Sequence, residues 1–337
     1  MKSLRVMLLL ILLMTAVAAC DSDNEEKTSD GKSKVTLFMS YVPSVQFAPV
    51  YVAYEKGYFA EEGIELDFEN SFNEIDGVDR IAVNNLQFAI LSGEQILLGR
   101  NVGKPLVYVM EWYHRFPVGV VVPADSDIQT PDDLRGRKVS LPYFQGASYI
   151  GLRALLESAN LGEDDLELQE VGFDAPAVMC ERQVEAATVY IANEPLTISQ
   201  CYDVRVIEIS DYANLVSNGL VTNEKTIKDK PDLVRGMVRA LQRGVADTIA
   251  NPDEAFELAL KHVSDLPAEQ HETQRQVLLN SIELWRSDEI GATNPAAWER
   301  TQQILIDMGL LPKALDNLNA SYTNEFLSDV SRPTPES

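Results

Sequence analysis

Residues 47–64 read FAPVYVAYEKGYFAEEGI, and this stretch says more about the fold than any other part of the chain. Apolar residues recur at helical spacing over 49–59, which predicts a helix. Gly57 supplies the left-handed backbone with which many helices end. Residues 64–68 then alternate between apolar and polar side chains, as a half-buried strand does. A helix followed directly by a strand is the repeating unit of an α/β fold.

The alternation of strands and helices continues on both sides of this stretch. The pattern restarts after Val122, which indicates a second α/β unit, and helices dominate from Lys230 onward. We therefore expect an α/β protein with mainly parallel sheets and a helical C-terminal region. Apolar or alternating runs predict strands at 35–39, 88–91, 105–110, 118–122, 138–141, 166–171, 184–190 and 205–209.

The N-terminus has the features of an export signal. Two cations precede a short apolar run over 6–17, and small residues follow it, which predicts a signal peptide at 1–19. Cys20 comes next and resembles the acylated cysteine of bacterial lipoproteins; the alternative is an ordinary signal that contains a cysteine. Residues 20–34 are expected to be the lipidated Cys20 and a flexible tether, because 21–34 hold no apolar side chain. Residues 331–337 are polar and are expected to form a frayed tail.

The composition excludes several classes of function. The chain has 52 Asp and Glu against 28 Lys and Arg, and it lacks the basic stripe that a nucleic-acid-binding protein needs. No second apolar run reaches the length of a membrane span. The strong negative charge also makes a highly charged anionic ligand less expected.

Cys180 and Cys201 are the two cysteines that follow the predicted signal. An exported protein can keep a disulfide, so these residues are either bridged or two buried thiols. His114, His262 and His271 have no metal-ligand spacing with a cysteine, so we expect no metal and no cofactor. The spacing of the residues indicates neither a Ser-His-Asp catalytic set nor a catalytic pair of carboxylates, so we expect that the protein is not an enzyme.

Five segments in order resemble one family, the thiamine-precursor and sulfonate-binding class of ABC solute-binding proteins, including its riboflavin-binding members. The resemblance implies a type II periplasmic-binding fold with two α/β lobes. The segments are 47–64, 87–105, 131–139, 193–196 and 230–255.

The resemblance also implies a division of the chain. Two crossing segments are expected near 115–122 and 210–220. Lobe one would then consist of 35–118 and 220–330, and lobe two of 119–219.

In open α/β sheets, ligands bind beyond the carboxyl ends of the strands, so the residues that follow each strand are candidates for a cleft site. Aromatic side chains are frequent there, which favours a flat ring stacked between Tyr41, Trp112 and Tyr143. The alternative is that many of these rings fill the lobe cores. The candidates are Tyr41, Gln46, Phe47, Ser92, Glu94, Trp112, Tyr113, Tyr143, Gln145, Ser148, Tyr190 and Asn193.

The resemblance implies a binding lipoprotein on the extracytoplasmic face of the cell membrane, with an ABC permease and its ATPase as partners. Riboflavin is the first expectation for the ligand, and a thiamine pyrimidine precursor is the second. A sulfonate fits less well, because only Arg115 and Lys138 lie near the expected cleft. The alternative from another class of function is an enzyme, a pyrimidine synthase of the same family, but the dense cysteine cluster of that enzyme is absent from this sequence. A sensory lipoprotein that binds a ligand without transporting it is a further alternative.

Overall fold

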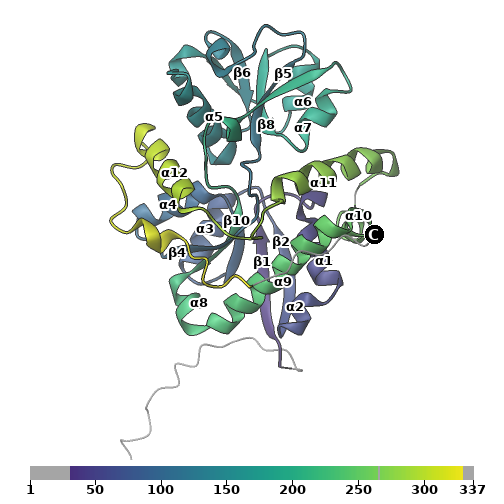
Figure 1. The fold of residues 1–337 in the computed structure, drawn as a ribbon, viewed down its shortest axis with the longest axis vertical. Coiled ribbons are helices and arrows are strands. Elements are labelled where there is room, and N and C mark those ends of the chain that lie inside the picture. The colour runs from purple at the N-terminus through teal and green to yellow at the C-terminus, as the bar shows by residue number, and fades with distance from the viewer. Residues whose placement is uncertain (1–30, 265, 329–337) are drawn as a thin grey trace, which may run out of the picture.

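A computed structural model describes residues 31–264 and 266–328. The predicted signal peptide, Cys20, most of the tether and the predicted tail lie outside the described residues. Two α/β bodies are stacked along the long axis of the molecule (Figure 1). Each is built on one five-stranded sheet, which confirms the predicted two-lobed α/β architecture. Within the described residues, no helix combines the length and apolarity needed to cross a membrane.

The first sheet belongs to the body that we call lobe one. β10 runs antiparallel to both of its neighbours, and the other four strands share one direction. The strand order is β2 (Ile64–Asn70), β1 (Ser33–Met39), β3 (Phe88–Leu91), β10 (Gly219–Asn223) and β4 (Leu106–Glu111). Its helices are α1 (Ala48–Glu55), α2 (Tyr58–Glu61), α3 (Glu74–Ala82), α4 (Gly93–Asn101), α8 (Glu224–Asp229), α9 (Pro231–Ala250), α10 (Pro252–Leu260), α11 (His271–Trp285) and α12 (Pro295–Asp307).

The second sheet belongs to lobe two and repeats this plan. β5 is the antiparallel strand here, and the other four strands share one direction. The order is β7 (Glu167–Glu170), β6 (Lys138–Leu141), β8 (Ala186–Tyr190), β5 (Val118–Pro123) and β9 (Val204–Glu208). Its helices are α5 (Gly146–Ser158), α6 (Ala175–Cys180) and α7 (Glu194–Ile198).

The two antiparallel strands follow the segments where the chain passes between the sheets. The chain leaves β4 at its carboxyl end and enters the second sheet as β5; it leaves β9 in the same way and returns as β10. Because each crossing starts at a carboxyl edge and enters the facing sheet from its own carboxyl edge, the incoming strand must run against the others. The carboxyl ends of both sheets therefore face one another across a cleft.

The first crossing differs from the prediction. It covers 112–117 rather than 115–122, because Val118–Pro123 is already strand β5. Every residue of that strand is buried, so it is a central strand and not a connection. The second connection covers 209–218, where the prediction had placed a crossing near 210–220. We propose the division into lobes on the basis of these two connections.

The segment that opened the sequence analysis forms two helices instead of one. Gly57 has a positive φ of 76° and follows the end of α1, as predicted for a glycine at a helix end; the predicted helix over 49–59 is divided there, because α1 ends at Glu55 and α2 begins at Tyr58. α1 packs against α9, where Gly244 lies beneath the backbone of Pro49. A Cβ at Gly244 would be 2.1 Å from the Pro49 carbonyl oxygen, so only glycine allows this approach.

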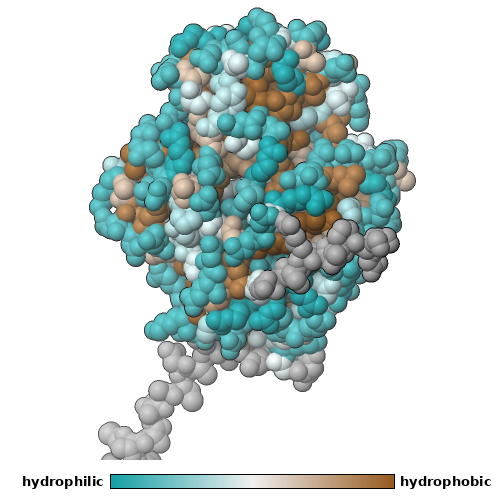
Figure 2. Space-filling model, viewed as in Figure 1, coloured by the Kyte–Doolittle hydropathy of each residue, from teal (hydrophilic) through white to brown (hydrophobic). Residues whose placement is uncertain are grey.

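Hydrophilic residues cover most of the face seen in Figure 2, and apolar residues form smaller patches among them. Trp285 and Trp298 are buried in lobe one, as core residues would be. The acidic composition is thus carried on a solvated surface around an apolar interior.

Cys180 and Cys201 are joined by a disulfide in lobe two. It connects the end of α6 to the turn after α7 and closes a loop with a sequence separation of 21. Replacing both cysteines with Ser is expected to lower the free energy of unfolding by about 3 kcal/mol, because the unfolded chain gains entropy when the loop opens. Urea denaturation with and without reductant measures this. Reductant should destabilise the parent and leave the double variant unchanged; equal stability of the two proteins would contradict the prediction.

Candidate ligand-binding site

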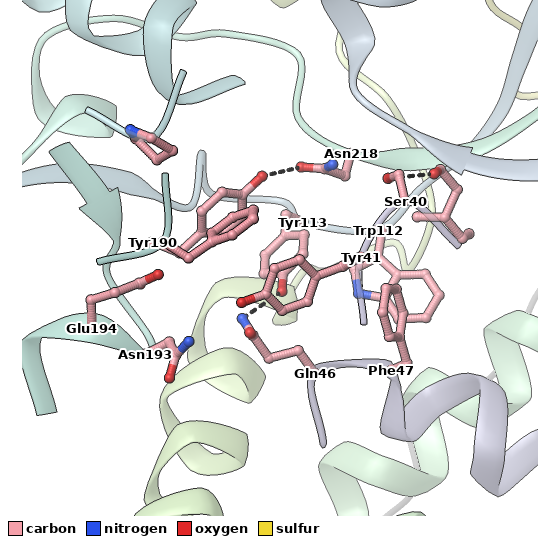
Figure 3. A pocket seen from close by; sticks show the side chains of 13 residues that line it. Ser40, Tyr41, Gln46, Phe47, Trp112, Tyr113, Tyr190, Asn193, Glu194 and Asn218 are labelled. Atoms are coloured by element: carbon pink, nitrogen blue, oxygen red, sulfur yellow. Dashed lines mark hydrogen bonds between the residues drawn. The ribbon is translucent and has the colours of Figure 1, made fainter. Parts of the chain in front are cut away.

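A pocket opens between the lobes, where the carboxyl ends of the two sheets face one another (Figure 3). It has an empty volume of about 680 Å³, part of which is its opening to solvent. Six of its thirteen lining side chains are aromatic, and none is Lys, Arg or His. The lining residues are Ser40, Tyr41, Gln46, Phe47, Ile90, Trp112, Tyr113, Pro142, Phe173, Tyr190, Asn193, Glu194 and Asn218.

The wall from lobe one comes from residues that follow β1 and β4. Gln46 and Phe47 lie in a short 3-10 helix, Val45–Phe47, and the Gln46 amide donates a hydrogen bond of 3.2 Å to the Ser44 hydroxyl. The Gln46 side-chain amide donates a hydrogen bond of 3.3 Å to the Tyr113 hydroxyl, which fixes both side chains on the wall. Trp112 meets Phe47 edge to face, with the ring centroids 6.1 Å apart. This wall is therefore a supported aromatic surface and not a set of free side chains.

The wall from lobe two comes from the end of β8 and the start of α7. The Tyr190 hydroxyl donates a hydrogen bond of 3.2 Å to the Asn218 side-chain oxygen, in the second crossing. Asn193 and Glu194 follow at the beginning of α7, and Figure 3 shows both on the same side of the pocket as Tyr190. Asn193 and Glu194 thus place two polar side chains on the lobe-two wall, in addition to Ser40, Gln46 and Asn218 elsewhere around the pocket (Figure 3).

Glu194 is the ionisable residue of this wall. Its Oε2 atom is buried and has no hydrogen-bond partner among the described residues. Burial raises the pKa of the carboxyl group to about 7. Burial and then the charge of Glu194 raise the pKa of Tyr41 to about 12. A buried acceptor without a donor is costly, so this atom is suited to receive a donor from a ligand.

Seven of the twelve predicted residues lie on the pocket wall, and five do not. Ser92 and Glu94 are buried beside Glu74, and Ser92 donates to the Glu74 carboxylate from its amide (2.5 Å) and its hydroxyl (2.6 Å). Tyr143 contacts Phe173 beside the pocket but does not line it. Gln145 precedes α5, and Ser148 is buried in its first turn. The seven on the wall are Tyr41, Gln46, Phe47, Trp112, Tyr113, Tyr190 and Asn193.

The prediction missed Ser40, Ile90, Pro142, Phe173, Glu194 and Asn218. Ser40, Ile90 and Pro142 lie at strand ends that the same rule covers, and Glu194 adjoins a predicted residue. Phe173 and Asn218 lie in connections without a periodic pattern. The two cations expected near the cleft are paired elsewhere: Arg115 with Glu208, and Lys138 with Glu167 at 3.9 Å.

Known proteins resemble this chain in sequence and fold. Riboflavin-binding protein RibY of Chloroflexus aurantiacus is 36% identical, over 97% of this chain and 99% of that protein. A formylaminopyrimidine-binding protein of Halalkalibacterium halodurans is 26% identical, over 89% of this chain and 92% of that protein. Both of these relatives are binding proteins.

The periplasmic aliphatic sulphonate binding protein of Escherichia coli superimposes with a TM-score of 0.72, over 87% of this chain and 98% of that one, at 16% identity. This likeness concerns the fold alone, and it confirms the predicted periplasmic-binding-protein fold. The NMT1/THI5-like family matches residues 44–255. That match and the full-length similarity to RibY show that the chain belongs to the NMT1/THI5-like family.

Proposed function

We propose that this protein binds riboflavin outside the cytoplasm and delivers it to an ABC importer. The observation that carries the proposal is the pocket between the lobes, which has aromatic walls, no cationic side chain among its lining residues and one buried carboxylate oxygen, Glu194 Oε2, without a partner among the described residues. The sequence similarity to a riboflavin-binding protein supports the same ligand.

The lining suits a flat, uncharged ring system. Aromatic pairs in offset or edge-to-face arrangements contribute about 0.5–1.5 kcal/mol each beyond the burial of their area. Tyr41, Trp112 and Tyr190 offer such rings from both lobes. Gln46 and Asn193 carry both donors and acceptors, which can bind ring carbonyls or hydroxyl groups of a neutral ligand.

A thiamine pyrimidine precursor is the second candidate. Glu194 favours it, because a carboxyl group can pair with the amino group and ring nitrogen of an aminopyrimidine, and one relative binds a formylaminopyrimidine. A sulfonate is disfavoured, since the pocket presents no cation to balance its charge. A synthase that depends on a cysteine cluster is disfavoured too, because Cys180 and Cys201 are bonded to each other.

Membrane attachment through Cys20 belongs to the same proposal. A lipid on Cys20 would hold the binding body close to a permease through the segment that precedes β1; the predicted tether to residue 34 is too long by two residues, because β1 already begins at Ser33. Metabolic labelling with a palmitate analogue tests this. Label should enter the parent and be lost from Cys20→Ser, which should appear in the soluble fraction.

The ligand is tested with the chain from Asp21 onward. Riboflavin should raise the melting temperature and quench tryptophan fluorescence, because Trp112 lies on the pocket wall. Hydroxymethylpyrimidine, its formylamino relative and taurine are the comparison ligands. If a pyrimidine shifts the melting temperature and riboflavin does not, the ligand is the thiamine pyrimidine precursor and not riboflavin. If taurine alone shifts the melting temperature, both of these ligands are wrong.

A further inference from the structure

Four aromatic side chains meet across the two lobes beside the pocket, and we call them the rim cluster: Tyr41 and Phe72 of lobe one, and Tyr143 and Phe173 of lobe two. Phe72 and Phe173 form the closest pair, with ring centroids 4.9 Å apart and planes tilted by 32°. Tyr41 contacts Phe72 at 5.8 Å and Phe173 at 5.6 Å. Tyr143 contacts Phe173 at 5.6 Å.

Tyr41 packs against the core of lobe one, whereas Phe72, Tyr143 and Phe173 belong to none of the hydrophobic core clusters of the described residues. Phe72 is 56% exposed and Phe173 is 42% exposed, although each ring buries one face against the other lobe. Large apolar side chains at such exposures gain little from their own lobe. Their contact therefore exists only while the lobes are close together.

Each ring is held on a fixed backbone. On lobe one, the Ser71 amide donates to the Met39 carbonyl (3.1 Å) and the Asn70 side chain donates to the Tyr41 carbonyl (2.9 Å). On lobe two, the Gly172 amide donates to the Pro142 carbonyl at 3.0 Å. These bonds tie Phe72 and Phe173 to segments that also carry pocket residues. Movement of one lobe would thus separate the rings and open the pocket together.

We propose that Phe72 is a positioning residue, which with Phe173 forms a latch that keeps the lobes closed over the ligand. Phe72 does not line the pocket, so it acts on a ligand through its neighbours: through closure by its contact with Phe173, or through the position of Tyr41, and the scattering measurement below separates the two. A ligand that prefers the closed form is released when the lobes open, so a weaker latch should speed release more than it changes association. The choice of riboflavin as probe rests on the proposed function, but the latch itself does not.

Phe72→Ala tests the latch. Stopped-flow tryptophan fluorescence with riboflavin should show release faster by about 3- to 10-fold, the range expected for loss of one aromatic pair, and association changed less than 2-fold. Phe72→Trp should restore slow release. Phe144→Ala is the matched control, because Phe144 is 48% exposed on lobe two and contacts Tyr149 of the same lobe.

Small-angle X-ray scattering of the ligand-free variants keeps this test independent of the ligand. Phe72→Ala should have a larger radius of gyration than the parent, and Phe144→Ala should not. If the wild-type protein does not bind riboflavin, the proposed ligand is wrong. The scattering measurement, which needs no ligand, then tests the latch by itself. Unchanged scattering, or release at the parent rate, in Phe72→Ala would overturn the latch.

Discussion

Replacing Glu194 with Leu is expected to stabilise the ligand-free protein and, in the same variant, to weaken riboflavin binding by about 10- to 100-fold. Both effects follow from one atom, Oε2, which is buried on the pocket wall with no donor among the described residues. Without ligand, such an acceptor costs about 1–3 kcal/mol, so Leu should raise the melting temperature by about 2–6 °C. With ligand, the carboxylate gains a charge-assisted hydrogen bond of about 1.5–3 kcal/mol that Leu cannot make.

The pH dependence separates this role from a packing effect. The pKa of Glu194 in the ligand-free protein is raised to about 7 by burial. A ligand N–H or O–H that bonds to the carboxylate stabilises the ionised form, so affinity should rise as the pH increases from 6 to 8. Glu194→Gln keeps the shape and should remove this rise, which calorimetric titration measures. Equal affinities for the parent and the Leu variant would show that Glu194 does not contact the ligand.

The strand-end rule located much of the pocket because it requires only the order and direction of strands. Tyr41 and Trp112 follow β1 and β4, and both line the pocket. Ser92 and Glu94 follow β3 in the same way, yet they are covered. The second crossing lies over them: a Cβ on Gly93 would be 2.3 Å from the Val216 side chain. The path of a connection is set by tertiary packing, and it has no sequence period.

The prediction for the residues that follow β6 in lobe two was wrong for a related reason. Pro142 reaches the pocket, but the chain then turns away as the Phe144 amide donates to the Glu170 carboxylate at 3.2 Å. A positive φ of 74° at Gly146 starts α5. This turn directs the chain at Gln145 and Ser148 away from the pocket. The presence of a glycine in the sequence is not enough to predict such a turn. The sequence could not decide whether Cys180 and Cys201 are bridged, because their separation along the chain does not give the distance between them in the fold.

Glu94 and Glu74 are carboxyl groups at the starts of α4 and α3, and Ser92 lies beside both. Glu94 is 2% exposed, and Glu74 is partly buried. Burial, and then the charge of Glu74, raises the pKa of Glu94 to about 8. Burial also raises the pKa of Glu74, against the hydrogen bonds from Ser92. The charges of Glu74 and Glu94 also affect Tyr190. The pKa of Tyr190 is raised first by burial and then by the charges of Tyr113, Glu74 and Glu94.

Glu94→Gln is therefore expected to be more stable than the parent at pH 8.5, by about 3–6 °C in melting temperature, and similar to it at pH 5. In the unfolded chain a glutamate ionises near pH 4.5, whereas folded Glu94 holds its proton up to about pH 8. The stability that the protonated group contributes is thus fully present below pH 4.5 and is lost as the pH rises through 8. Gln keeps the shape and does not titrate, so the variant should escape this loss. Calorimetry from pH 5 to 9 measures the difference, with Glu65→Gln on the exposed side of β2 as control. A constant difference across that range would contradict the prediction, because it would mean that Glu94 is already ionised at pH 5 in the folded protein.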